Sequence, residues 1–448
     1  MLDIKIEFKL FLSEKIIMSI CDVCGKEFKD LEKHKQRKRP CKAAVPVTAS
    51  VSEFRESSKN FHSSISKEVR QEEGIYFTPK KVRDILFSKL AELGVSPKTI
   101  LEPSFGSGEF LLDSKRIYPE ATLLGVEKNV ELFQSVQCPG ATLTCGDFLE
   151  WKGKGDLILG NPPYFVIKTD HLSSKEKKMF ALKYAEAMTS RPNMYILFLY
   201  KCLEEHLDSD GILAFILPTS LYNCSYYQPL RNYIQKNTTI LHVENLDKPG
   251  FYETAQDTML LILQKKKTND DYIFQSKNGN LYISPYYKEL YSITQNTKTL
   301  TDLGLGAKTG NVVWNQIKKN LSETGTLLIY SSNIKNGKLT LDNLGGNQKK
   351  QYVKDCDKPT ISGPLILVER GYGNSYRFNS IKVELDFNDF YAENHVNVIY
   401  PKTPDVSNNL DVVLKSFQDE RSHQFIKWFI GNGSISATDL ETLIPIFI

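Results

Sequence analysis

The chain has 448 residues, of which 41% are hydrophobic, 25% charged and 11% aromatic, and its formal net charge is +4. At about 100–200 residues per domain, this predicts two to four globular domains and excludes disordered, collagen-like and disulfide-scaffold chains. No uncharged apolar run approaches the ~18 residues of a membrane span, and charges interrupt the apolar residues of the first segment. We therefore expect an intracellular protein of the cytoplasm or nucleus, neither secreted nor bound to a membrane.

The first predicted element is a small zinc-binding module over residues 18–43. Cys21, Cys24, His34 and Cys41 provide four soft ligands, enough for one closed tetrahedral site. Residues 21–42 contain eight Lys/Arg and four Asp/Glu, so this segment alone carries a charge equal to that of the whole chain, which indicates contact with a polyanion. The alternative is a set of unligated thiols beside a solvated charge run. The pattern resembles a finger variant common in proteins of large DNA viruses, so a virus-infected host stays open.

A linker is predicted over residues 44–70, which are rich in Ser, Ala and Val with little apolar periodicity. From residue 71 to 268, short apolar runs alternate with longer amphipathic stretches. The predicted strands are Thr99–Glu102, Thr122–Glu127, Asp156–Gly160, Gly211–Leu217 and Thr258–Gln264, with helices at Ser173–Met188 and Tyr195–Leu207. This alternation predicts an α/β domain with a parallel, doubly wound sheet that is covered on both faces.

A glycine-rich loop follows the first predicted strand. Gly106 and Gly108 lack Cβ atoms where a backbone turn must approach a ligand closely, and Glu127 ends the next strand, where a carboxylate can accept hydrogen bonds from ribose hydroxyls. Asp147 ends the following strand-like segment, within reach of an adenine amino group. Taken alone, the loop fits an NAD site equally well, although Leu111 occupies the position of the third glycine. Each acid by itself is also explained as a helix cap or turn former.

The sequence Asn161-Pro-Pro-Tyr164 comes directly after an apolar strand. Pro162 and Pro163 restrict φ and lack N–H donors, so the turn is rigid and its carbonyls point outward. The Asn161 side-chain oxygen and the Pro162 carbonyl then each accept one hydrogen of an exocyclic amino group, which localises the nitrogen lone pair. Tyr164 offers a flat face for a stacked base, a contact that contributes about 1–3 kcal/mol. A plain turn is the alternative, and the position after a strand and a glycine loop favours catalysis.

On these motifs the chain resembles S-adenosylmethionine-dependent N6-adenine DNA methyltransferases of the gamma motif order, in which cofactor motifs precede the catalytic motif. The resemblance covers residues 70–265 and implies a Rossmann-like domain that methylates N6 of an adenine flipped out of duplex DNA. Asn161 at the first motif position favours adenine, because N4-cytosine enzymes usually have Ser or Asp there. The resemblance places Phe251 on the other face of the extruded base, although Tyr252 adjoins it. The residues that it assigns to the cofactor are Thr78, Glu102, Gly106, Gly108, Glu127, Asp147 and Phe148.

Residues 269–448 are predicted to form a mixed α+β target-recognition domain. Gly306–Asn311 resembles the opening of such a domain, and two later segments, Arg370–Arg377 and Glu393–Ile399, have the mix expected of base-edge and phosphate contacts. Ordinary loops are the alternative for each segment. The predicted partner is double-stranded DNA, on which the chain acts as a monomer, and a separate cognate restriction endonuclease is a second predicted partner.

Two other functions remain open on the sequence. A methyltransferase of RNA or of a protein glutamine also uses Asn-Pro-Pro-Tyr, but such enzymes typically lack a recognition domain of this size. A catalytically silent DNA-binding protein would retain the fold, but the intact catalytic motif and Glu127 argue against decay. The recognised DNA sequence cannot be read from these residues.

Overall fold

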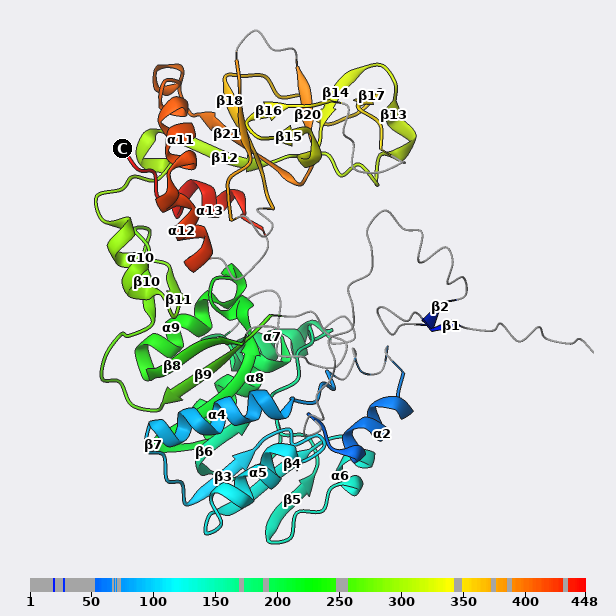
Figure 1. Ribbon diagram of the computed structural model, residues 1–448, viewed down its shortest axis with the longest axis vertical. Helices are drawn as coiled ribbons and strands as arrows, with labels where there is room; N and C mark the ends of the chain where they lie inside the picture. The colour runs from blue at the N-terminus through cyan, green and yellow to red at the C-terminus, as the bar shows by residue number, and fades with distance from the viewer. Residues whose placement is uncertain are drawn as a thin grey trace, which may run out of the picture. The chain divides into compact units, whose positions relative to one another are not determined.

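The computed structural model describes residues 19–20, 27–28, 53–66, 68, 70, 74–168, 173–187, 193–246, 257–341, 349–371, 376–384, 389–429 and 434–448. The chain divides into two compact units, Met1–Glu53 and Phe54–Ile448. In the first unit, strands β1 (Ser19–Ile20) and β2 (Glu27–Phe28) pair antiparallel (Figure 1). The predicted ligands and the predicted base-stacking aromatic lie outside the described residues: Cys21, Cys24, His34, Cys41 and Phe251.

The second unit contains a seven-stranded sheet with the order β5-β4-β3-β6-β7-β9-β8. Its strands are β3 (Thr99–Glu102), β4 (Thr122–Glu127), β5 (Ala141–Cys145), β6 (Gly155–Gly160), β7 (Leu207–Pro218), β8 (Thr239–Leu246) and β9 (Thr258–Gln264). Strands β3 to β7 pair in parallel with one another, whereas β9 runs antiparallel to both β7 and β8. The prediction of a purely parallel sheet is therefore wrong for β9. The connection from β8, residues 247–257, is shorter than the crossover that a parallel return requires.

Helices cover both faces of this sheet, as the doubly wound pattern predicts. The helices are α4 (Lys80–Glu92), α5 (Glu109–Ile117), α6 (Val130–Ser135), α7 (Ser174–Lys183), α8 (Met194–Lys201) and α9 (Gln228–Asn237). Alternate strand residues face opposite sides: Leu157 and Leu159 pack in the cluster that includes α4 and α5, and Ile158 packs in the cluster that includes α8 and α9. The predicted helix Tyr195–Leu207 is α8 followed by a π-helical turn, Cys202–His206.

Part of the predicted linker forms helix α2 (Glu56–Ser64). The aromatic side chain of Phe54 precedes the helix, and that of Phe61 lies within it. They pack in a small cluster with Ile75, Phe77 and Leu132. These contacts join residues 54–65 to the domain that contains the seven-stranded sheet, which the serine-rich composition of the segment does not indicate.

The chain after β9 has mixed α+β structure. The hairpin β10 (Ile273–Gln275) and β11 (Leu281–Ile283) precedes α10 (Tyr287–Thr294). One four-stranded sheet joins β12 (Leu305–Thr309), β21 (Val396–Pro401), β18 (Leu365–Glu369) and β19 (Ser380–Val383). A second joins β13 (Leu321–Ser322), β17 (Tyr352–Val353), β14 (Thr326–Ile329) and β20 (Phe390–Ala392). Smaller elements are the hairpin β15 (Ile334–Lys335) with β16 (Lys338–Leu339), and helices α11 (Asn409–Gln418), α12 (Glu420–Phe429) and α13 (Ala437–Thr442).

Among the helices of the described ranges, we find none with the length and apolar character needed to cross a bilayer.

Candidate active site

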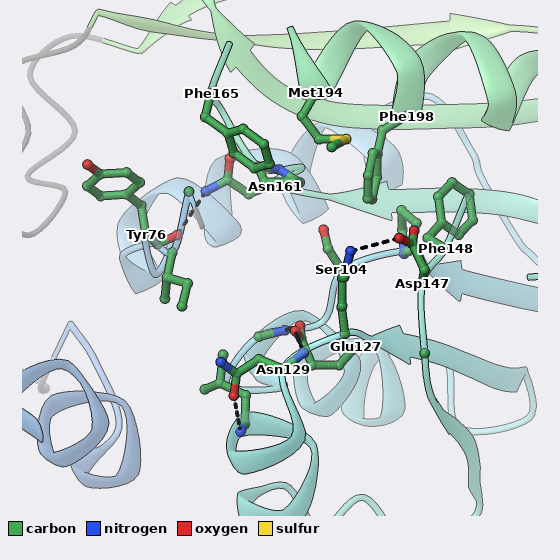
Figure 2. A pocket seen from close by; sticks show the side chains of 18 of the residues that line it. Tyr76, Ser104, Glu127, Asn129, Asp147, Phe148, Asn161, Phe165, Met194 and Phe198 are labelled. Atoms are coloured by element: carbon green, nitrogen blue, oxygen red, sulfur yellow. Dashed lines mark hydrogen bonds and ion pairs between the residues drawn. The ribbon is translucent and has the colours of Figure 1, made fainter. Parts of the chain in front are cut away.

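A cavity of about 580 Å³ lies at the carboxyl ends of β3, β4 and β6 (Figure 2). Parallel strands end at one edge of a sheet, and ligands of open α/β folds bind in the crevice outside that edge. Figure 2 shows Phe165 and Met194 on one side of the cavity, Glu127 and Asn129 on the opposite side, and Tyr76 at one end.

The cavity brings together many of the residues that the sequence predicts for one site. Those that line it are Gly106, Glu127, Asp147, Phe148, Asn161 and Pro163. Thr78 and Glu102 line a smaller hollow, which shares Tyr76, Ser104 and Asn161 with the main cavity. Three predicted residues lie outside both linings: Gly108, Pro162 and Tyr164.

The side-chain amide of Asn161 is held by two hydrogen bonds. Its Nδ2 donates to the carbonyl oxygen of Tyr76 (3.2 Å) and to Oγ1 of Thr78 (3.1 Å). The reversed amide would place Oδ1 against the Tyr76 carbonyl, acceptor against acceptor, so the hydrogen bonds decide the orientation. Oδ1 is buried and has no hydrogen-bond partner among the described residues. A buried acceptor without a partner costs about 1–3 kcal/mol, so this oxygen is suited to a ligand that donates a hydrogen bond.

A buried ion network anchors the segment that contains Thr78. Arg83 on α4 donates from Nη1 to the carbonyl oxygen of Thr78 (2.5 Å) and from Nε to Oδ2 of Asp113 (2.7 Å). The same guanidinium pairs with the buried Glu109 on α5, and Glu109 also accepts from Ser58 Oγ on α2 (2.5 Å). Three helices therefore determine where Thr78 lies, and Thr78 in turn orients Asn161.

Glu127 at the end of β4 holds the glycine loop through its carboxylate. Oε2 accepts from the backbone N–H of Gly106 (2.8 Å), and Oε1 accepts from the backbone N–H of Asn129 (2.8 Å). Gly106 has φ +53°, in the left-handed region that favours glycine. A carboxylate has about four acceptor positions, so it can accept several hydrogen bonds at once.

An acid and an aromatic wall border another part of the cavity. Burial would raise the pKa of Asp147, but the hydrogen bonds from Lys128 Nζ (2.8 Å) and the backbone N–H of Leu149 (2.9 Å) outweigh it, so the pKa is lowered. The ionised carboxylate accepts hydrogen bonds only. Phe148 is buried, and its ring centroid lies 4.9 Å from that of Phe198 (Figure 2). This wall suits a flat apolar ring with polar edges.

Glu102 at the end of β3 adds a buried carboxyl group at the edge of the site. Burial raises its pKa well above the usual range, against the effect of the Leu111 backbone N–H, and the charge of Glu127 raises it further. Glu102 Oε2 and the hydroxyl of Ser104 are buried without hydrogen-bond partners in the part of the chain that the structure describes. Both groups line the smaller hollow, so a polar ligand there gains two hydrogen bonds.

Tyr164 is anchored away from the cavity lining. Its hydroxyl donates to the carbonyl oxygen of Ile216 (2.6 Å), and its ring meets Tyr195 edge to face at 5.9 Å between centroids. Burial raises the pKa of the Tyr164 hydroxyl well above its usual value. The next residue, Phe165, lines the cavity instead. Whether Tyr164 stacks on a base stays a prediction.

Sequence reasoning missed several lining residues, among them Tyr76, Ser104, Asn129, Phe165, Met194 and Phe198. A signal exists for the last two. Asn193 caps α8 by accepting from the backbone N–H of Tyr195 (3.4 Å). Residues four apart share a helix face, so the capped start directs Met194 and Phe198 to the same side.

Gly108 serves the backbone of the loop, where the sequence predicts a close approach to a ligand. It is the N-cap of α5 with φ +74°, and a Cβ added there would lie 2.5 Å from Val136 Cγ1. We expect Gly108→Ala to lower the free energy of unfolding. Strain of an alanine in the left-handed region contributes ~1–2 kcal/mol, and overpacking against Val136 contributes ~1–3 kcal/mol. Gly94→Ala is the matched control, since Gly94 has φ +70° and nothing within 4 Å of its Cβ position. Urea denaturation measures the free energy of unfolding of both variants, and an equal loss of stability in the two would contradict the packing role of Gly108.

Several known proteins are similar to this chain. Residues 112–251 match the family of the Eco57I restriction-modification methylase. Over 407 residues the chain is 31% identical to the type II methyltransferase M.CvrRI of Paramecium bursaria Chlorella virus XZ-6E, covering 88% of this chain and 99% of that protein. Over 423 residues it is 31% identical to the modification methylase CviBIII of Paramecium bursaria Chlorella virus NC1A, covering 89% and 100%. A solved Listeria monocytogenes structure, assigned to the class I S-adenosylmethionine-dependent methyltransferases, aligns with 48% of this chain and 69% of that chain at 18% identity and TM-score 0.38.

Proposed function

This chain belongs to the type II methyltransferases of restriction–modification systems, and from that membership we propose that it methylates N6 of an adenine flipped out of duplex DNA, with S-adenosylmethionine as the methyl donor. One observation carries the proposal. The Asn161 amide is held by both protons of Nδ2 while its buried Oδ1 is left without a described partner, at the edge of a large cavity. That is the state required of an acceptor for an incoming amino group.

The residues around the cavity fit S-adenosylmethionine. We propose that Glu127 binds its ribose hydroxyls, and that Asp147 and Phe148 hold its adenine by hydrogen bonding and packing. The unpaired oxygens of Glu102 and Ser104 are suited to the ammonium group of its methionine part. When bound, S-adenosylmethionine supplies an electrophilic methyl group, and a cavity of about 580 Å³ is large enough for such a ligand.

The catalytic contribution of this chain is to orient the target amine. Asn161 Oδ1 and the Pro162 carbonyl each accept one of its hydrogens, so its lone pair is localised on nitrogen and directed at the methyl group. Such positioning, together with fixed dipoles, lowers the barrier without a covalent enzyme intermediate. The proton released after transfer passes to water. Tyr164 and Phe251 are proposed to stack on the two faces of the flipped base.

Methyl transfer to alternative acceptors tests the proposal. Purified protein is incubated with radiolabelled S-adenosylmethionine and duplex DNA, RNA or unmodified protein, and DNA from cells expressing it is sequenced with N6-methyladenine detection. We expect label in duplex DNA only and methylated adenine at one recurring sequence. Label in RNA or protein, or N4-methylcytosine in the DNA, would overturn the assignment.

A prediction concerns Thr78, whose Oγ1 accepts a hydrogen bond from Asn161 Nδ2. Thr78→Val keeps the shape of the side chain and removes the acceptor, and a neutral hydrogen bond is worth about 0.5–1.5 kcal/mol. We expect the single-turnover rate of transfer to fall about three- to tenfold with the cofactor Kd nearly unchanged. Thr78→Ser, which keeps the hydroxyl, is the control. A raised Kd with a normal rate would instead assign Thr78 to cofactor binding, as the family resemblance implies.

We also propose that Cys21, Cys24, His34 and Cys41 bind one zinc ion. They lie outside the described residues, and no cluster of three or more metal-ligating side chains occurs within the described ranges. We expect metal analysis of the intact chain to find one zinc per molecule, and Cys24→Ser to lose it at equal protein concentration. Zinc in neither protein would refute the site.

We further propose that the protein acts as a monomer and that a separate restriction endonuclease shares its target.

A further inference from the structure

Positive charge is concentrated in one part of the chain after β9. Residues 303–360 contain nine lysines and four acidic residues, so this stretch carries a formal charge of +5 although the whole chain carries only +4. Within the described structure the stretch includes β13, β14 and β17, three strands of one small sheet (Figure 1). This stretch of the sequence is different from the basic cluster in residues 21–42.

Part of this charge is organised around Trp314. Lys318 Nζ and Lys349 Nζ each lie 5.5 Å from the centroid of its rings, and Lys349 Nζ also lies 4.7 Å from the ring centroid of Tyr330. Each contact is within the ~6 Å range of a cation–π interaction. The indole therefore has two ammonium groups near its rings. We call this part of the chain the Trp314 surface and define it by Trp314, Lys318, Lys319, Lys349 and Lys354.

The neighbouring lysines join this surface through the backbone. The backbone N–H of Lys354 donates to the carbonyl oxygen of Asn320 (2.9 Å), which places the β17 end beside Lys319. Lys318, Lys319 and Lys354 are exposed. Lys319, Lys349 and Lys354 form no ion pair with another described residue, whereas the adjacent Lys350 pairs with Glu323 at 3.2 Å.

Like charges gathered around one side chain, with no ion-pair partner described for Lys349, favour the binding of an anion. A single small anion would neutralise one or two charges, but the excess extends along 58 residues of sequence. A polyanion with regularly spaced charges matches it better, and duplex DNA carries one negative charge per ≈1.7 Å of helix axis. Lysine is a flexible point charge that suits phosphate oxygens better than base edges.

We propose that the Trp314 surface binds the phosphate backbone of the substrate DNA and so sets the register of the duplex on the enzyme. The inference rests on the proposed function, because it takes DNA as the substrate. Contacts to phosphate carry no sequence information, so this surface contributes affinity and orientation, and other side chains choose the target sequence.

The test compares two double variants of the full chain. Lys318→Ala/Lys349→Ala removes the two ammonium groups over Trp314. Lys335→Ala/Lys338→Ala is the matched control. Those lysines are exposed on β15 and β16 and belong to the same charged stretch of residues 303–360, but they have no cation–π contact in the described structure. For each protein, DNA affinity is measured against salt concentration by fluorescence anisotropy, and methylation is measured at saturating DNA.

We expect the Lys318/Lys349 variant to lower the magnitude of the slope of log affinity against log salt by about 1–2, since each neutralised phosphate contributes about 0.9. Its KM for DNA rises, while kcat, cofactor Kd and the methylated sequence stay the same. The control pair changes the slope by less than half as much.

An unchanged slope, an equal change in the control pair, or an altered target sequence would overturn the inference. Failure of the proposed function is recognised separately, because the wild-type protein would then transfer no methyl group to DNA. A wild type that binds RNA more tightly than duplex DNA, with the same dependence on Lys318 and Lys349, would also refute the inference.

Discussion

Asn161→Ala is expected to slow methyl transfer to adenine about 1,000-fold while the Kd for S-adenosylmethionine changes less than about threefold. Removing one preorganised group that stabilises developing charge costs about 10²–10³ in rate, and here the same group also positions the amine. Asn161 touches the acceptor base in the proposed mechanism, so cofactor affinity has no reason to follow. Single-turnover transfer of a radiolabelled methyl group measures the rate, and calorimetry measures the Kd.

The control for this variant is Asn232→Ala on α9. Asn232 is exposed and lies outside both linings of the site, so its loss should alter neither the rate nor the Kd. Retention of more than a tenth of the activity in Asn161→Ala would exclude the proposed lone-pair mechanism. A large rise in cofactor Kd would instead show that the side chain supports the cofactor cavity.

Glu127→Ala is expected to raise the Kd for S-adenosylmethionine about 10- to 100-fold. The carboxylate accepts from the backbone N–H groups of Gly106 and Asn129, and a hydrogen bond to a charged group contributes about 1.5–3 kcal/mol. Its removal frees the glycine loop and takes away the proposed acceptor for ribose hydroxyls. Equilibrium dialysis with labelled cofactor measures the change.

Turnover at saturating cofactor separates binding from chemistry in this variant. We expect kcat to fall less than fivefold once Glu127→Ala is saturated, because the carboxylate does not touch the target amine in the proposed mechanism. Glu127→Gln keeps one acceptor oxygen and should lie between wild type and Glu127→Ala. A normal Kd with a much reduced kcat would show that the assignment of Glu127 to the cofactor is wrong.

The edge of the sheet that carries the site was predictable because the relevant signals are local. Apolar runs mark β3, β4, β6 and β9, and all four predicted ranges agree with the structure to within one residue. Glu102 and Glu127 are the last residues of the first two of these strands, and Asn161 follows β6. Parallel strands end at a common edge, so their sequence positions alone predict that these side chains meet.

Other features depend on contacts between segments far apart in the chain. The serine-rich stretch before residue 66 reads as a linker, but Phe54 and Phe61 find partners at Phe77 and Leu132, so α2 forms. The role of Gly108 is visible only once Val136 packs against it. The local composition of a segment does not show which distant residues pack against it, and that packing overrides local conformational preference.

By itself, the sequence indicated five of the seven strands of the large sheet, the turn at Asn161–Tyr164 and the acids at the strand ends, because each is encoded in a few consecutive residues. Only the tertiary structure decided that β9 runs antiparallel between β7 and β8, that Tyr164 donates to Ile216, and that Phe165 lines the cavity. It also decided the orientation of the Asn161 amide, which depends on Thr78, 83 residues earlier in the chain. Hydrogen-bond partners of this kind are set by which segments pack together, and a linear sequence specifies that packing only through the free energy of the whole fold.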